Sequence, residues 1–309
     1  MTTIKDYFGV HNVSDLMIGE RNYKVSPDYA FSNPNLIVGV ELEIEGWNDD
    51  NPKEYKGFVF EVDNSLRNNG VEAVTLPMFS KYVPNLLTNF FKTFGITENN
   101  YSHRCSTHVH INAQNLHVEQ VRSICVLYQA LERVILSYVG NDRDNNIFCV
   151  PWHQCNISQD FVNKFTQDLN LTTRSWQKYT ALNILPLRDR GTLEFRHLEG
   201  TCNVARITEW INLIGCIVRY ATEVSYETIV ETIVNMNTVS NYGAFVEHIF
   251  REFSTALTTL PEYEENLALG VVDCKLCLVN APVATTTREA FGQLFGAAEV
   301  SIQRSTLTF

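Results

Sequence analysis

The chain of 309 residues is 45% hydrophobic and carries a formal net charge of −11, so it can bury a full core in one large domain or two small ones. The negative charge, with no block rich in Lys and Arg, excludes a protein that relies on non-specific binding to nucleic-acid phosphates. The longest apolar run is too short for a membrane span, so we expect no membrane insertion.

Two features bear on the cellular compartment. The N-terminal stretch MTTIKDYFGV lacks the basic and apolar regions of a secretory signal peptide. The 8 cysteines do not have the dense spacing of a disulfide framework, which favours reduced thiols. We therefore expect a cytoplasmic protein.

The first clear element follows an irregular lead-in over residues 1–35, which are polar and rich in turn residues. LIVGVELEIEGW (36–47) alternates apolar and acidic residues, which predicts a half-buried strand. Its polar face carries Glu41, Glu43 and Glu45.

A hairpin is predicted next. FVFEVDNSL (58–66) alternates again, with Phe58, Phe60 and Val62 on one face and Glu61 and Asp63 on the other. RNNG is a turn signal, and VEAVTLP then predicts the returning strand, which carries Glu72.

Helices and further strands complete the chain. RCSTHVHIN (104–112) predicts a strand whose period of two places His108 and His110 on the same face. YTALNILPL and GTLEFRHL (179–198) predict a pair of strands, and the second carries Glu194 and Arg196 opposite Leu193 and Phe195. Helical spacing of apolar residues predicts helices over 81–94, 117–140, about 158–168, 204–225, about 227–253 and 287–296. With no internal repeat, this order favours one α+β domain around an antiparallel sheet.

The polar faces of these strands predict a common site. Antiparallel sheets usually bury one face, and here the other faces carry carboxylates, two imidazoles and a guanidinium. If the strands are neighbours, they form a carboxylate-rich trough. Carboxylate oxygens suit Mg²⁺, and Mn²⁺ also accepts imidazole.

The motifs and their order resemble a known family. GVELEIE, DNSL followed by GVE, CSTHVHIN, and ALNILPLRDRGTLEFRHLEGT resemble the amidoligases of the glutamine synthetase and glutamate–cysteine ligase superfamily. The resemblance covers residues 36–220, and Arg104 lies just outside its core pattern.

The resemblance implies a fold and an activity. The fold would be a glutamine-synthetase-like catalytic domain, a curved antiparallel sheet packed by helices, in residues 36–309, with a motif core over 36–220 and a helical part over 221–309. The activity would be ATP-dependent ligation of a carboxylate to an amine through an acyl phosphate, with Mg²⁺, or Mn²⁺, as cofactor. The partners would be ATP, a carboxylate and an amine, each a small molecule or a peptide.

The resemblance also implies roles for particular residues. The implied metal ligands are Glu41, Glu43, Asp63, Glu72, His108 and Glu194. His110 and Arg196 would contact nucleotide phosphates, and Asn183 would orient the sugar or a substrate. Arg196, His110 and Glu72 are the implied catalytic residues, and Glu61 is a less secure addition to the acidic set.

Other interpretations remain open. Each acidic or histidine pair alone could be an ordinary polar surface, and Glu194 with Arg196 a surface ion pair. A metal-dependent hydrolase could use the same trough without ATP, and a non-catalytic relative could use it only for binding. Cys274 with Cys277, and CVPWHQC (149–155), could each bind a metal, although neither has a second pair at zinc-site spacing.

Overall fold

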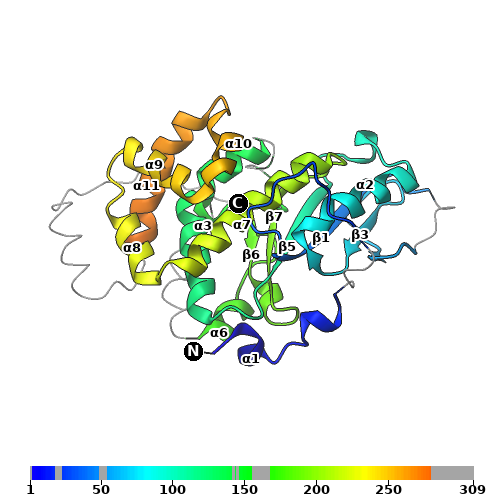
Figure 1. Cartoon of the computed structure of the whole chain (residues 1–309), viewed down its shortest axis with the longest axis horizontal. Coiled ribbons are helices and arrows are strands. Elements are labelled where there is room, and N and C mark those ends of the chain that lie inside the picture. Colours follow the sequence, from blue (N-terminus) through cyan, green and yellow to red (C-terminus); the bar gives the residue numbers. More distant parts are fainter. Residues whose placement is uncertain are drawn as a thin grey trace, which may run out of the picture.

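The computed structural model describes residues 2–17, 23–48, 54–140, 143, 146–154 and 168–279. Within these residues, one open antiparallel sheet runs in the order β2-β3-β1-β5-β7-β6, and the short β4 pairs with β1 beside β3. The strands are β1 (Ile37–Ile44), β2 (Phe58–Glu61), β3 (Val71–Thr75), β4 (Met78–Phe79), β5 (Ser106–Asn112), β6 (Leu182–Asn183) and β7 (Thr192–Glu199). Together with the helices, the sheet gives the α+β class that the sequence predicts (Figure 1).

Alternation along the strands separates a core face from a polar face. On β1, the residues Val38, Val40, Leu42 and Ile44 are buried in the hydrophobic core. The same core contains Val109 and Ile111 of β5. The acidic and histidine positions of these strands therefore share the opposite face.

Helices cover the core face. Helix α3 (Val118–Val139) packs against β7 and α7 (Val204–Glu223), and α7 packs against α2 (Val83–Phe94). The prediction that 117–140 forms a helix is confirmed, as is that of a helix over 81–94 with Pro84 in its first turn.

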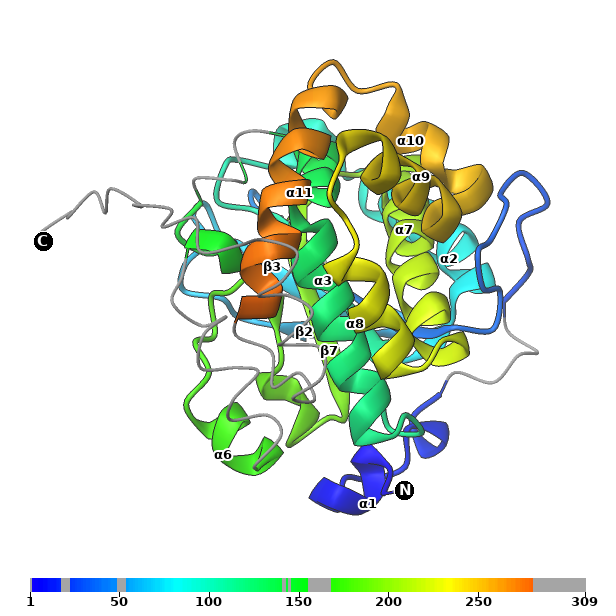
Figure 2. The same cartoon turned by 90° about the vertical axis from the view of Figure 1, so that its left-hand side faces the viewer.

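The C-terminal helices pack on α3 (Figure 2). They are α8 (Tyr226–Val234), α9 (Val239–Phe250), α10 (Thr255–Thr258) and α11 (Tyr263–Val279). The stretch predicted to be helical over about 227–253 is helical but divided, because α8 ends at Val234 and Thr238 caps α9 by accepting the Asn241 amide. The helices predicted for about 158–168 and 287–296 fall outside the described residues, except Asp168, which caps α6 (Leu169–Arg174).

Two predicted strands are shorter than their sequences indicate. Strand β2 ends at Glu61, so Val62 is 70% exposed, and the turn that follows contains Asn68 and Asn69 with positive φ. In YTALNILPL only the two residues of β6 pair with β7, because a 3-10 turn at Leu185–Leu187 contains Pro186.

The lead-in over residues 1–35 is not entirely irregular. Helix α1 (Ile4–Phe8) begins after Thr3, whose hydroxyl accepts the Asp6 amide. Ile4 is fully buried, so this segment is docked on the body of the protein. None of the described helices combines the length and hydropathy of a membrane-spanning segment.

Candidate functional site

Strand register places the predicted polar residues in one line across the sheet. Glu43 of β1 lies opposite Glu72 of β3, and Glu72 lies opposite Glu61 of β2. In an antiparallel pair, directly opposite residues point to the same face. The half of the trough formed by β2, β3 and β1 therefore consists of carboxylates.

The other half joins carboxylates to imidazoles. Glu41 lies opposite His108 of β5, and His110 lies opposite Glu194 of β7. Asn183 of β6 follows, opposite Glu194. The structure thus brings together the sequence-predicted site residues of six strands on one face.

Two groups of side chains are close enough to share a cation. Ligand atoms of Glu41, His110 and Glu194 lie within 4.8 Å of one another, as do those of Glu43, Asp63 and Glu72. Among the described residues, these are the groups of three or more acidic, histidine or cysteine residues with that property. The first group is buried, and the second includes two half-buried carboxylates. We call them the buried group and the hairpin group.

His108 connects the two groups. Its Nδ1 lies 2.9 Å from Glu41 Oε1 and 3.6 Å from Glu194 Oε1, whereas its Nε2 lies 3.9 Å from Glu43 Oε1. A proton on Nδ1 donated to Glu41 leaves the Nε2 lone pair for a cation, the arrangement typical of metal-binding histidines. Nε2 of His108 and Oε2 of Glu43 are both buried without a hydrogen-bond partner among the described residues.

Glu194 is held by two donors. Arg196 Nη1 donates to its Oε1 at 2.5 Å, and the Asn183 side-chain amide donates to its Oε2 at 2.7 Å. Asn183 also accepts the Leu185 amide at 3.0 Å and is only 2% exposed. Here Asn183 orients Glu194, and its predicted contact with a sugar or substrate stays a prediction.

Arg196 is anchored by a loop carbonyl. Its Nε donates to the Phe148 carbonyl at 3.2 Å, and its guanidinium lies 5.8 Å from the ring centroid of Tyr179. His110 is anchored by Thr192, whose hydroxyl lies 3.0 Å from Nδ1. Both predicted phosphate-binding groups are therefore fixed at defined positions beside the carboxylates.

The electrostatics differ between the two groups. Burial raises the pKa of Glu41, but His108 and His110 outweigh it and hold the pKa well below its ordinary value. Burial also raises the pKa of Glu194, which His110, Arg196 and His108 together lower below the ordinary range.

Glu72 has the opposite shift. Burial, and then the charges of Glu41, Glu43, Glu61 and Asp63, raise its pKa to about 8. The hairpin group therefore contains more negative charge than its neighbours compensate, and a divalent cation would relieve this repulsion.

A cavity of about 340 Å³ opens at one end of the trough, and we call it the His110 cavity. Its polar lining includes His110, Thr192, Arg190 and Glu61, and Gly39 lies opposite His110 on the adjacent strand. The remaining wall is largely aliphatic: Val13, Leu16, Ile37, Val38, Val59, Val74 and Leu76. Asp189 also lines it, so the cavity offers an apolar slot beside charged side chains of both signs.

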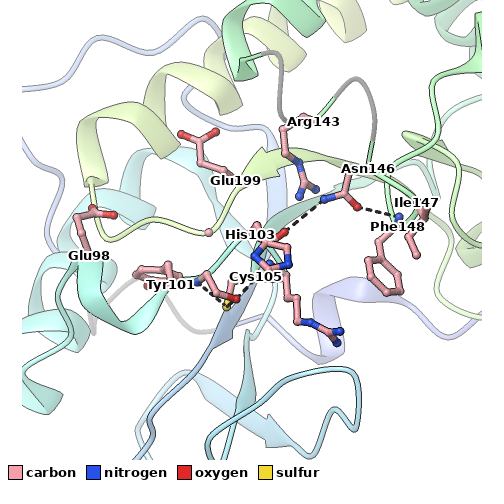
Figure 3. A pocket seen from close by; sticks show the side chains of 12 residues that line it. Glu98, Tyr101, His103, Cys105, Arg143, Asn146, Ile147, Phe148 and Glu199 are labelled. Atoms are coloured by element: carbon pink, nitrogen blue, oxygen red, sulfur yellow. Dashed lines mark hydrogen bonds between the residues drawn. The ribbon is translucent and has the colours of Figure 1, made fainter.

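A larger cavity, of about 710 Å³, lies at the other end of the strands (Figure 3). It is lined by residues that precede β5, by residues that end β7, and by the segment around Arg143 and Phe148. We call it the Arg104 cavity, after the arginine that precedes the HVH strand. The two cavities thus lie at opposite ends of the strands and differ in their lining.

Several lining residues were not predicted. Thr192, Arg190 and Gly39 lie within or beside the quoted motifs but carry no signal of their own. Arg143 lies in the polar stretch after α3, where hydrophobic periodicity is absent. In contrast, the predicted polar face of the strands located the carboxylates directly.

The two cysteine clusters gain no support from the described residues. Cys149 and Cys274 are buried, and burial raises the pKa of the Cys149 thiol to about 11, so this thiol is a poor metal ligand. His153 Nδ1 is bonded to Glu132 at 2.8 Å. Cys155 and the side chain of Cys277 lie outside the described residues.

Comparison with known proteins gives one positive result. A family model described as "Putative amidoligase enzyme" matches residues 4–218, more than half of the chain. A search of curated proteins found no match. The matched range contains every strand of the sheet and every residue of the trough.

Proposed function

The chain belongs to the amidoligase family, and on this premise we propose that it is an ATP-dependent carboxylate–amine ligase with a glutamine-synthetase-like site. The observation that carries this proposal is the pair of ligand groups on one sheet face, between two cavities. A two-substrate reaction with a nucleotide needs such a divided site. Family membership supports an enzyme that forms amide-type bonds.

The donor set fits divalent cations. Among the described residues, Glu43 Oε2 and His108 Nε2 are buried without hydrogen-bond partners, so both can ligate a cation. The raised pKa of Glu72 reflects negative charge around it that a cation would compensate. Glu41, His110 and Glu194 would hold one ion, and Glu43, Asp63 and Glu72 a second, with His108 between them. Bound Mg²⁺ or Mn²⁺ would neutralise charge on nucleotide phosphates and on the transferring phosphoryl group.

The His110 cavity suits the nucleotide. Its aliphatic wall offers a surface for a base, and Arg190 supplies a cationic group for phosphates, because His110 is assigned to the first ion. Arg196, fixed by Glu194 and the Phe148 carbonyl, would add a preorganised positive charge where the phosphoryl group transfers.

The reaction then needs no nucleophilic side chain. A substrate carboxylate oxygen attacks the γ-phosphorus, and the bond to the departing ADP breaks. The amine nitrogen attacks the acyl carbon, the bond to phosphate breaks, and the amine loses a proton. Cys105, near the trough, is no competing nucleophile, because burial raises the pKa of its thiol.

The proposal is tested by incubating the protein with ATP, MgCl₂ and pools of carboxylic acids and amines. We expect phosphate release that depends on an acid, together with new masses that match amides. The same mixture without ATP should give neither product. Hydrolysis of an amide without any nucleotide would instead support a metal-dependent hydrolase and overturn the ligase proposal.

A further inference from the structure

The core residues of strand β7 have an irregular spacing. Phe195 and Leu198 are both fully buried in the hydrophobic core, although they are three residues apart. In a regular strand, an odd separation places two side chains on opposite faces of the sheet. Strand β7 must therefore contain one extra residue between them.

The register between β5 and β7 shifts at this place, which is a β-bulge. The pairing advances by two residues on β5, from Val109 to Thr107, while it advances by three residues on β7. Arg196 and His197 are therefore the bulge residues, and they share the single position opposite His108.

The bulge separates the directions of its two side chains. Arg196 Nη1 donates to Glu194 Oε1 at 2.5 Å on the site face, whereas His197 Nε2 lies 2.9 Å from the Tyr128 hydroxyl in the core. A bulge increases the local twist of a strand and thereby changes where a side chain points. The direction of Arg196 therefore depends on keeping the bulge.

Arg143 holds both residues of the bulge. Its Nε donates to the His197 carbonyl at 2.7 Å, and its Nη2 donates to the Arg196 carbonyl at 2.8 Å and to the Ser106 hydroxyl at 3.0 Å. Arg143 is only 3% exposed, so these bonds are shielded from water. One guanidinium thus joins the two bulge carbonyls to β5, a task that suits its planar set of donors.

The same segment also holds the side chain of Arg196. The Phe148 carbonyl accepts a hydrogen bond from Arg196 Nε at 3.2 Å. Asn146 connects this carbonyl to Arg143, because its Oδ1 accepts the Phe148 amide at 2.8 Å and its own amide donates to the Arg143 carbonyl at 3.3 Å (Figure 3). Arg196 is therefore held by its backbone and by its side chain from one segment.

We propose that Arg143 is a positioning residue: by holding the β7 bulge, it keeps the Arg196 guanidinium directed at Glu194 and at the nucleotide phosphates. Arg143 acts through Arg196. Its effect on nucleotide binding rests on the proposed function, whereas its effect on the direction of Arg196 does not.

An NMR measurement on the full chain tests the direction of Arg196 without any ligand. With ¹⁵N-labelled arginine, the Nε–H group of Arg196 gives the signal that is missing in Arg196→Lys. We expect Arg143→Gln to move this signal towards those of exposed arginines and to speed its hydrogen exchange roughly 10-fold or more, because the bond to the Phe148 carbonyl is weakened. An unchanged Arg196 signal in folded Arg143→Gln would overturn the inference.

Two further variants separate positioning from general loosening. Arg143→Lys keeps the charge but not the planar fork, so it should give an intermediate change, and it serves as the test if Arg143→Gln does not fold. Arg219→Gln is the matched control, because Arg219 Nη2 also donates to a backbone carbonyl, that of Ile249, at 2.6 Å, but from α7. It should leave the Arg196 signal unchanged, and an equal change there would overturn the inference. Thermal unfolding shows which variants are folded.

Nucleotide binding tests the consequence for the site. Calorimetry follows the non-hydrolysable analogue adenylyl imidodiphosphate with MgCl₂. We expect Arg143→Gln and Arg196→Gln each to weaken binding roughly 10- to 100-fold, the range for a charged hydrogen bond. The double variant should be within about twofold of the weaker single variant, because both changes remove the action of the same guanidinium.

The outcomes distinguish this inference from the proposed function. Losses that multiply in the double variant would overturn the positioning role of Arg143 and leave the ligase function standing. A wild-type protein that does not bind the analogue would contradict the proposed nucleotide site, and the Arg196 signal in Arg143→Gln would still decide whether Arg143 positions Arg196.

Discussion

Glu43 of β1 and Glu45, which follows the end of that strand, are similarly buried, but their carboxylates have different surroundings. Glu45 Oε1 accepts the Arg67 amide at 3.0 Å and thereby holds the hairpin turn. Glu43 Oε2 has no partner among the described residues, although the side chain belongs to the hairpin group. Position on the polar face therefore does not by itself mark a candidate ligand, whereas an unused buried oxygen beside other carboxylates does.

This contrast gives a matched pair of variants. Glu43→Gln should weaken Mn²⁺ binding by roughly 100-fold or more, because it removes a charged ligand without opening a cavity. Glu45→Gln should change Mn²⁺ affinity by less than about threefold and should mainly weaken the bond to the turn. Calorimetric titration of both variants measures this difference, and equal losses in the two would remove Glu43 from the metal site.

Glu72 predicts a pH dependence of metal binding. Its pKa of about 8 means that in the metal-free protein it holds a proton at neutral pH, which an incoming cation must displace. Affinity for Mg²⁺ should therefore fall as pH decreases below about 8, approaching tenfold per pH unit. In Glu72→Gln this dependence should largely disappear, which titrations at several pH values would show.

The raised pKa of Glu72 also predicts how the free energy of unfolding of the metal-free protein changes with pH. Because the folded-state pKa of Glu72 lies above the ordinary value of 4.5, the folded protein keeps a proton that the unfolded chain has lost. Without metal, this group makes the protein less stable as pH rises from about 4.5 towards about 8. Added Mg²⁺ should offset that loss. A metal-free stability that rises through this interval in wild type relative to Glu72→Gln would contradict the assignment.

At the scale of elements, helix α3 fixes the loop that positions Arg196. Glu132 of α3 is 1% exposed and accepts hydrogen bonds from the Tyr128 hydroxyl at 2.5 Å, the Trp152 amide at 2.6 Å and the His153 amide at 2.9 Å. Trp152 in turn donates its indole N–H to the Leu182 carbonyl of β6 at 2.9 Å. One buried carboxylate thus joins α3, the 146–154 segment and the edge of the sheet.

We predict that Glu132→Gln lowers the free energy of unfolding by about 2–4 kcal/mol, because it weakens several buried bonds to one charged acceptor. The control Glu119→Gln, exposed in the first turn of the same helix, should cost about 0.5 kcal/mol. Urea unfolding measures both. Equal, small effects would show that the Glu132 network does not hold the loop.

The sequence predicted the elements with strong hydrophobic periodicity. It did not predict where strands end when a turn or a proline interrupts an apolar stretch. The alternation in β1 and β5 correctly separated core from site, because side-chain direction follows directly from strand geometry. The ends of β2 and β6 were wrong, since a turn and Pro186 end strand pairing within apolar sequence. Glu132 stands at a core position of α3 between Tyr128 and Ile135, and an acidic residue at such a position is the sequence signal of a buried hydrogen-bond acceptor.

At the scale of the whole molecule, the site depends on contacts between distant segments. The N-terminal segment supplies His11, Val13 and Leu16 to the His110 cavity, and Gln114 holds it by donating to the His11 carbonyl at 2.8 Å. Residues before β5 and after α3 form the Arg104 cavity. Local sequence patterns carry no information on how distant segments pack together. The sequence therefore predicted the polar strand faces of the trough but did not predict either cavity.

The proposed acyl-phosphate reaction is tested most directly by the fate of one oxygen atom. An acid that supports phosphate release is labelled with ¹⁸O in its carboxylate, and the protein converts it with ATP, MgCl₂ and an amine. Because the attacking carboxylate oxygen stays on phosphorus when the amine displaces phosphate, we predict one ¹⁸O atom in each inorganic phosphate, detected by mass spectrometry. Phosphate without the label, or amide chemistry that proceeds without ATP, would contradict the account.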